Sequence, residues 1–321
     1  MGDVHAQLSY DVAIAETIKN YWLLTKPGIV LGNVISAAGG FFLASKGDID
    51  ITLIIYTLLG IALVIASGCV FNNLIDRKVD RVMSRTRARI LARDAMPPKN
   101  AILYALVLGI SGVAILLMAT NILCTALVVF GFSVYVVFYS LYLKRRSLYA
   151  TYVGSIAGAI PPVAGYCAVN GSFDPGAGIL FLIFVLWQMP HCYALAIVRL
   201  TDYISAGIPV APVKLGVRRA KQHIVFFIFA FLIVSLMLTF TGFTGYLYLG
   251  IITVLGVVWL WIAWKGYKVS DNRGWAKLIF QFSFICILAL SFMMSIDCKS
   301  SSQKRRLISV DSKYLASSQE Y

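Results

Sequence analysis

The sequence predicts an all-α membrane protein, a bundle of nine transmembrane helices around a central cavity. Of its 321 residues, 60% are hydrophobic and only 13% are charged, whereas about 25% of the residues in a soluble domain are charged. Long apolar runs, close to the ~20 residues that cross a bilayer, alternate with short basic links. The six cysteines show no paired spacing, so neither a disulfide framework nor a zinc site is expected.

Nine apolar stretches are long enough to cross a membrane. They cover residues 24–45, 51–75, 100–119, 122–142, 149–169, 177–198, 224–241, 246–264 and 276–295. The link at 171–176 is rich in turn-forming residues, which predicts a tight reversal. We therefore divide the chain into a polar lead-in at 1–20, a transmembrane domain at 21–296 and a polar tail at 297–321. The tail is rich in serine and charge and is expected to be disordered.

The basic residues predict which side of the membrane each link faces. Twenty-two of the 28 lysines and arginines fall in the N-terminal segment and in the links after the second, fourth, sixth and eighth spans. The opposite links contain only Lys46. Because positively charged links stay in the cytoplasm, the N-terminus and these links should be cytoplasmic, although five basic residues in the tail do not fit. Membrane topology explains most of the net charge of +14, so no nucleic-acid partner is expected.

The end of the second span carries the most informative motif, with Asn72, Asp76 and Asp80 at intervals of four residues. On a helix they would lie within about 80° of one face and span about 12 Å. Two carboxylates one turn apart repel each other unless a cation lies between them. Mg²⁺ binds one or two carboxylates together with water and phosphate oxygens, and the arginines that follow, Arg85, Arg87 and Arg89, could hold a diphosphate. The motif predicts a magnesium–diphosphate site; a solvated helix end is the alternative.

Two further segments place polar residues at the same predicted face of the membrane. The link after the sixth span contains Arg199, Asp202 and Tyr203, and the end of the fourth span carries Tyr139 and Lys144. One acidic cluster alone is weak evidence. Three polar clusters at one end of an apolar bundle predict a functional site there.

The pattern Asn-x-x-x-Asp-x-x-x-Asp after the second span resembles that of the UbiA superfamily of intramembrane prenyltransferases. Within it, Trp-Gln-Met-Pro-His at 187–191, followed by Asp202 and Tyr203, is similar to the heme O synthases. Other matching segments lie at 25–28, 68–73, 139–146, 157–162 and 209–213, and the resemblance runs from about residue 20 to residue 295.

Two positions depart from the pattern of the superfamily. Many of its members carry a second Asp-x-x-x-Asp, but here Ala206 stands four residues after Asp202. Heme O synthases resemble this chain in that respect. The departure therefore supports the resemblance to that subfamily and weakens the case for a complete second metal site. Ile90 replaces the proline of an Arg-Thr-Arg-x-Arg-Pro run, which changes a loop turn and is not expected to abolish activity.

The resemblance implies an enzyme that transfers a farnesyl group from farnesyl diphosphate to a vinyl group of heme B. Water would then add, giving the hydroxyethylfarnesyl side chain of heme O for heme-copper terminal oxidases. The resemblance also implies Mg²⁺ as the cofactor, heme B as a substrate and a place in the bacterial inner membrane, embedded in the lipid bilayer. Heme A synthase and terminal oxidase subunits are candidate partners.

The roles that the resemblance implies are carried over to the matching positions. Metal binding is expected of Asn72, Asp76, Asp80 and Asp202. Catalysis is expected of Asp76, Asp80, Asp202 and Lys144. Substrate binding is expected of Asn72, Arg85, Arg87, Tyr139, His191, Arg199 and Tyr203.

Several interpretations stay open. His191 could contact heme, or it could be a polar residue hydrogen-bonded to a neighbouring helix. Lys26, just before Pro27, could bind the diphosphate, or its long side chain could simply extend to the membrane interface. For the whole chain, a UbiA-type transferase that prenylates an aromatic quinone precursor is the nearer alternative, and a non-catalytic membrane transporter is the more distant one.

Overall fold

The computed structural model describes residues 15–298, which are almost entirely helical. The long helices are α2 (Pro27–Ser45), α3 (Ile51–Asp80), α4 (Pro98–Ala119), α5 (Ile122–Ser133), α6 (Ala150–Asn170), α7 (Pro175–Val198), α10 (Gly216–Phe240), α11 (Tyr246–Lys265) and α12 (Asn272–Ile296). The π-helix η1 (Val134–Leu143) continues α5, and the 3₁₀ turn η2 (Gly266–Lys268) follows α11. Two short helices, α8 (Leu200–Ser205) and α9 (Ala211–Lys214), lie between α7 and α10.

Nine helical segments within residues 15–298 are long and apolar enough to cross a membrane, as the sequence predicts. Three predicted boundaries were wrong because charged residues end an apolar run without ending a helix. Helix α3 runs to Asp80 rather than residue 75, α10 begins at Gly216 rather than 224, and α12 begins at Asn272 rather than 276. The longer α3 matters most, because it places the whole acidic motif on one helix.

Side-chain caps and one glycine fix several helix ends. Asp50, Asn121 and Asp174 each accept a hydrogen bond from a backbone N–H in the first turn of α3, α5 and α7, at 2.9, 2.9 and 3.0 Å. Gly171 ends α6 with a φ of 70°, which lies in the left-handed region that glycine adopts without strain. The predicted reversal at 171–176 is therefore confirmed, with Gly171 ending one span and Asp174 starting the next.

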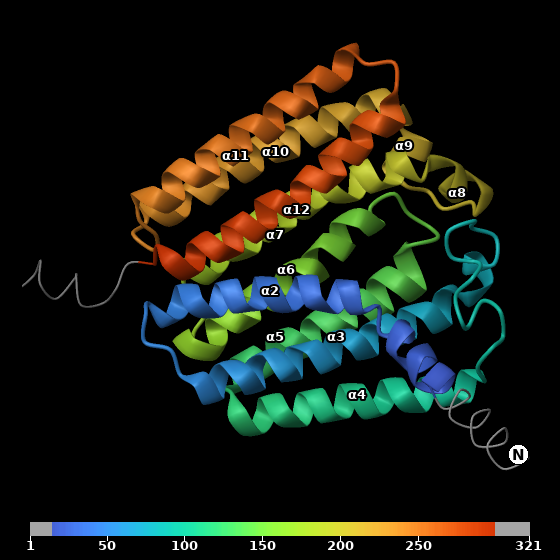
Figure 1. Ribbon diagram of the computed structural model, residues 1–321, viewed down its shortest axis with the longest axis horizontal. Helices are drawn as coiled ribbons and strands as arrows, with labels where there is room; N and C mark the ends of the chain where they lie inside the picture. Colours follow the sequence, from blue (N-terminus) through green and yellow to red (C-terminus); the bar gives the residue numbers. More distant parts are fainter. Residues whose placement is uncertain (1–14, 299–321) are drawn as a thin grey trace, which may run out of the picture.

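The spanning helices pack side by side (Figure 1), and α7 contacts α6, α10 and α12. Helices α2 and α6 approach each other closely because glycines face backbone atoms. A Cβ on Gly165 would lie 2.1 Å from the carbonyl oxygen of Ala37, and one on Gly40 would lie 2.0 Å from that of Pro162. Small residues of this kind let membrane helices pack with their backbones in contact.

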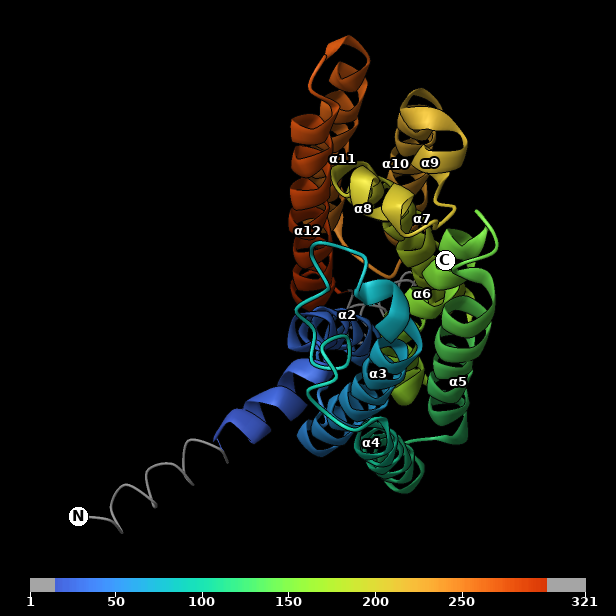
Figure 2. The ribbon, with the colours of Figure 1, turned by 90° about the vertical axis from the view of Figure 1, so that its right-hand side faces the viewer.

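One end of the bundle gathers the segments in which the sequence predicts a site. The link after α3 and the short helices α8 and α9 lie together there, on the right of Figure 1. Figure 2, viewed toward that end, shows these segments lying across the ends of the spanning helices.

The π-helix η1 shapes the same end of the bundle. Its last hydrogen bond runs from the backbone N–H of Lys144 to the carbonyl of Tyr139, five residues earlier, at 2.9 Å. The wider turn changes the direction of the side chains that follow it. Such π-helical turns occur frequently at functional sites.

Candidate active site

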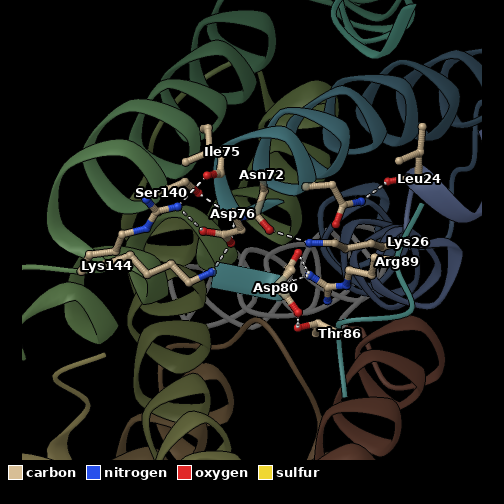
Figure 3. Close-up of polar contacts among 12 residues, drawn as sticks. Leu24, Lys26, Asn72, Ile75, Asp76, Asp80, Thr86, Arg89, Ser140 and Lys144 are labelled. Atoms are coloured by element: carbon tan, nitrogen blue, oxygen red, sulfur yellow. Dashed lines mark hydrogen bonds and ion pairs between the residues drawn. The ribbon is translucent and has the colours of Figure 1, made fainter. Parts of the chain in front are cut away.

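The motif on α3 is buried. Asn72, Asp76 and Asp80 are only 3%, 2% and 3% exposed and occupy one face of the last turns of the helix (Figure 3). A carboxylate is costly to bury unless it is paired and hydrogen-bonded. The solvated helix end that the sequence left open is therefore excluded, and the partners of these three side chains define the site.

Asp76 is at the centre of a dense network. Its carboxylate pairs with the Lys144 ammonium group, and the guanidinium of Arg145 lies 3.4 Å from its second oxygen. The Asn72 amide nitrogen donates to Asp76 Oδ2 and to Ser140 Oγ, each at 3.0 Å. Residues 68 positions apart in the sequence are thereby joined, and Lys144, the residue directly after η1, supplies the cation that pairs with Asp76 on α3.

Lys26 reaches the same network from the start of α2. Its backbone has a φ of 53°, and its amino group donates to the Asn72 carboxamide oxygen at 2.5 Å. Lys26 therefore points into the site, rather than simply extending along the membrane interface. Burial lowers the pKa of Lys26 to about 8.

Asp80 is held by Arg89, one of the three arginines that follow the motif, and not by Arg85 or Arg87. Arg89 Nη1 lies 3.0 and 2.8 Å from the two carboxylate oxygens of Asp80. The Thr86 hydroxyl donates to the Asp80 backbone carbonyl at 3.1 Å, which folds the link back onto the helix end. Arg85 and Arg87 are exposed and form no ion pair within the described part of the chain.

Asp202 joins the second polar segment to the link after α3. Its Oδ1 accepts from the backbone N–H and the hydroxyl of Ser84, at 3.1 and 2.7 Å. Three residues before it, the Nε of Arg199 is buried without a hydrogen-bond partner among residues 15–298. Burial raises the pKa of Tyr203 to about 12, so its phenol is protonated at neutral pH.

A cavity of about 170 Å³ lies beside this network, between η1, α6, α7 and the link after α7. Lys144 belongs to both the cavity wall and the network, and its ammonium nitrogen lies 5.7 Å from the ring centroid of Tyr139. The cavity is lined by Tyr135, Tyr139, Lys144, Ser147, Ala150, Thr151, Gly154, Gln188, Cys192, Tyr193, Leu195, Ala196, Tyr203, Ile208, Pro209 and Val210. It thus offers an aromatic wall next to the buried acids and cations.

Gln188 is one of the polar residues lining this cavity to which the sequence analysis assigned no role. Its Oε1 is buried and has no hydrogen-bond partner within residues 15–298. The amide packs against Gly158, where a Cβ would lie 2.2 Å from Oε1. A buried acceptor without a protein partner is rare and calls for water or a ligand. The motif at 187–191 contains Gln188, but only the structure shows that its amide oxygen is buried without a hydrogen-bond partner among residues 15–298.

His191 lies outside the residues that line the cavity. Its Nδ1 is 2.7 Å from Ser283 Oγ on α12, and its ring stacks on Trp187 with centroids 5.0 Å apart. Phe280 and Phe284 cover it at 4.6 and 5.1 Å. These contacts are those of the packed polar residue considered as the alternative from the sequence.

The donor atoms on α3 fit Mg²⁺. Asn72, Asp76 and Asp80 offer only oxygen ligands, which this ion prefers, and Mg²⁺ keeps several waters and phosphate oxygens in its shell. No cluster of three acidic, histidine or cysteine side chains within the described residues could hold a metal by itself. Asp202 is turned toward Ser84, so the structure places it in a separate contact from the two acids of α3.

The charges of the network also fit an anionic ligand. Two carboxylates, Asp76 and Asp80, face the cations Lys144, Arg145 and Arg89, and Lys26 adds a fourth basic group. Arg145 was not expected to form the site, whereas Lys26 and Arg89 were candidate diphosphate ligands whose partners in the network were not predicted. Their proximity depends on how α2 and two links fold, which residue spacing along α3 does not reveal.

The fold and this network define a class of protein: a multi-pass membrane protein with buried acids and cations beside an aromatic cavity. The chain belongs to the UbiA prenyltransferase family, whose model matches residues 33–285.

Curated relatives give a more specific comparison. One from Photorhabdus laumondii, named protoheme IX farnesyltransferase, is 55% identical over 280 residues, which cover 87% of this chain and 95% of the relative. Relatives of the same name from Yersinia pseudotuberculosis and Chromohalobacter salexigens are 54% and 55% identical with the same coverage. The resemblance identified in the sequence is therefore confirmed.

Solved structures agree on the fold. A digeranylgeranylglyceryl phosphate synthase superposes with a TM-score of 0.72 at 20% identity, covering 87% of this chain and 99% of that chain. A UbiA homolog from Archaeoglobus fulgidus, bound to GPP and Mg²⁺, superposes with a TM-score of 0.64 at 18% identity, covering 86% and 99%. At these identities the likeness concerns the fold alone.

Proposed function

We propose that the chain is a Mg²⁺-dependent transferase that moves a farnesyl group from farnesyl diphosphate to a vinyl group of heme B, forming heme O. The observation that carries the proposal is the pair of buried carboxylates on α3, each held by a cation, beside an aromatic cavity. Relatives with 54–55% identity over 87% of the chain are named protoheme IX farnesyltransferase, which favours heme over an aromatic quinone precursor.

The network on α3 would bind the diphosphate. Asn72, Asp76 and Asp80 would hold Mg²⁺, which supplies positive charge to the phosphate oxygens. Lys144 and Arg89 are each close enough to an acid to exchange that contact for a phosphate oxygen. Four basic groups around two carboxylates leave an excess of positive charge, which an anionic diphosphate would neutralise. Arg85, Arg87 and Arg199 lie in the two links at the same end of the bundle and could reach the outer phosphate.

Ionisation of the allylic diphosphate requires that charge be stabilised at both ends of the breaking bond. The carbon–oxygen bond breaks with its electron pair leaving on the diphosphate, next to Lys144 and Arg89. The allylic cation would face the rings of Tyr135 and Tyr139, whose centroids lie 5.8 Å apart in a stacked arrangement. Such aromatic faces stabilise a cation without attacking it, and the apolar part of the cavity wall would limit premature reaction with water.

The acceptor step would occur in the cavity. The π electrons of a heme vinyl group form the new carbon–carbon bond, which leaves a cation on the carbon next to the porphyrin. The oxygen of a water molecule then bonds to that carbon and a proton is released. We propose that Gln188 positions this water, because the residue lines the cavity and its buried Oε1 lacks a protein partner within residues 15–298. Gln188 would act as a positioning residue, since an amide is not a base at neutral pH.

The function is tested by mass spectrometry on membranes that contain the full chain. They receive heme B and farnesyl diphosphate, with and without Mg²⁺, and hydroxyethylfarnesyl heme is expected only with the metal. If an aromatic quinone precursor were prenylated while heme stayed unmodified, the chain would still be a prenyltransferase, but heme B would be the wrong acceptor. If neither acceptor reacts in folded protein, the transferase proposal fails and transport becomes the better account.

We further propose that the chain lies in the inner membrane of a bacterium with the site facing the cytoplasm. The concentration of basic residues in the links at the site end supports this orientation. Heme A synthase or terminal oxidase subunits would receive the product. Labelling of cysteines introduced into the link at 81–97 with a membrane-impermeant reagent tests the orientation: labelling from outside intact cells would contradict it.

A further inference from the structure

A second cavity lies on the outer side of α3, away from the acidic motif. It has a volume of about 450 Å³ and an apolar floor formed by Leu74, Ile75, Pro98 and Ile102. Three basic residues complete its wall: Arg77, Lys78 and Arg145. We call it the α3–α4 pocket. Arg77 and Lys78 have no role in the proposed reaction.

The geometry of α3 separates this pocket from the diphosphate site. At 100° per residue, Leu74 and Lys78 lie roughly 160° around the helix from Asp76. Arg77 is half-buried and Lys78 is exposed, and neither forms an ion pair within the part of the chain that the structure describes. Arg77 and Lys78 therefore bring to the pocket positive charge that pairs with no carboxylate in residues 15–298.

The pocket lies where lipid headgroups meet the protein. It is formed by the last turns of α3 and the first turn of α4, at the ends of two membrane-spanning helices. Below it, α4 exposes a continuous apolar surface, with Leu103 64%, Val107 54% and Ile110 68% exposed. A ligand that fills the pocket must therefore join an anionic group to a long apolar chain.

We propose that the α3–α4 pocket binds an anionic phospholipid, with the headgroup phosphate among Arg77, Lys78 and Arg145 and an acyl chain along α4. Basic residues near the membrane surface each contribute about 1 kcal/mol to the attraction of anionic lipids. Guanidinium groups additionally bind phosphate through paired hydrogen bonds. The proposal of a lipid site does not rest on the proposed farnesyl transfer.

Arg145 connects the pocket to the diphosphate site. Its guanidinium donates to the Ile75 carbonyl at 2.5 Å and lies 3.4 Å from the Asp76 carboxylate. The Arg145 side chain is 39% exposed, so one edge of the guanidinium is available to a lipid phosphate while another contacts α3. A bound lipid would hold Arg145 against the helix end.

The test is native mass spectrometry of the purified full chain in a neutral detergent, titrated with dioleoyl phosphatidylglycerol or dioleoyl phosphatidylcholine. The parent chain should bind one phosphatidylglycerol more tightly than any phosphatidylcholine. The double variant Arg77→Gln/Lys78→Gln should bind it about 30-fold more weakly, the equivalent of ~2 kcal/mol for two basic residues. The matched control is Arg218→Gln/Arg219→Gln, which removes two adjacent exposed arginines from α10 and should retain the parent affinity.

Equal phosphatidylglycerol affinity in the parent and the pocket variant would overturn the proposal, as would an equal loss in the α10 control. Inorganic phosphate that displaces the lipid at similar concentration would show a site for free phosphate instead. If the double variant does not fold, Ile102→Glu provides a second test of the pocket, because this substitution leaves all three basic residues in place. That residue is 39% exposed, and a negative charge there should weaken phosphatidylglycerol binding and leave phosphatidylcholine binding unchanged.

Discussion

Asp76→Asn is the most informative single substitution, because it removes one charge and keeps the shape of the side chain. Asp76 is 2% exposed and is contacted by Lys144, Arg145 and Asn72. The variant would lose a metal ligand and leave Lys144 without its carboxylate. Removing one partner of a fully buried ion pair costs about 3–5 kcal/mol. The Lys144 side chain is 20% exposed and can turn toward water, so we expect a smaller loss of stability, ~1–2 kcal/mol.

The effect on turnover should be much larger than the effect on folding. Removal of one preorganised electrostatic group from a transition state costs about 3–4 kcal/mol, or roughly 100- to 1000-fold in rate. The assay is the Mg²⁺-dependent formation of hydroxyethylfarnesyl heme, normalised to folded protein in the membrane. Asp94→Asn is the matched control, since Asp94 is 71% exposed and its one ion pair among residues 15–298 is with Arg81 on the same link. Turnover of Asp76→Asn within threefold of the parent would refute the metal assignment.

Four further outcomes follow from the structure. Arg89→Gln should raise the KM for farnesyl diphosphate by about tenfold or more, because Arg89 holds the second acid of the motif; steady-state kinetics would contradict this if Arg85→Gln had the larger effect. Gln188→Leu should shift the product toward a farnesylated heme lighter by one water, read from the mass spectrum, and an unchanged product ratio would exclude the positioning role. Gly165→Ala should lower the free energy of unfolding by ~1–3 kcal/mol, because its Cβ would lie 2.1 Å from a backbone oxygen; an unchanged melting temperature would contradict the close helix contact. Removal of Mg²⁺ by a chelator should abolish turnover, and restored activity on addition of Mg²⁺ is the required control.

Hydropathy predicts the fold well because the bilayer imposes length and composition on each span. All nine spans were placed, with the main errors where charged residues continue a helix, as in the last turn of α3. The spacing of Asn72, Asp76 and Asp80 also predicts that they share one helical face, since the helical period alone determines it.

Which basic residue contacts which residue of the motif could not be predicted from the sequence. Lys26 and Arg89 reach the motif through the path of the backbone, including a positive φ at Lys26 and a link folded back by Thr86. Contact between the link after α3 and Asp202 depends on the packing of segments 118 residues apart. The lack of a hydrogen-bond donor for Gln188 Oε1 can be recognised only once the positions of the neighbouring donors are known. Tertiary packing, rather than local spacing, decides these contacts.

Binding of a metal together with a diphosphate tests the central claim most directly. The purified full chain would be titrated with Mn²⁺, a paramagnetic replacement for Mg²⁺, in the presence of farnesyl thiodiphosphate, with bound ion followed by electron paramagnetic resonance. Tight Mn²⁺ binding is expected only when the thiodiphosphate is present, and it should be lost in Asp76→Asn and Asp80→Asn but not in Asp94→Asn. Binding that is unaffected by the two α3 substitutions would contradict the assignment of the site to this buried motif.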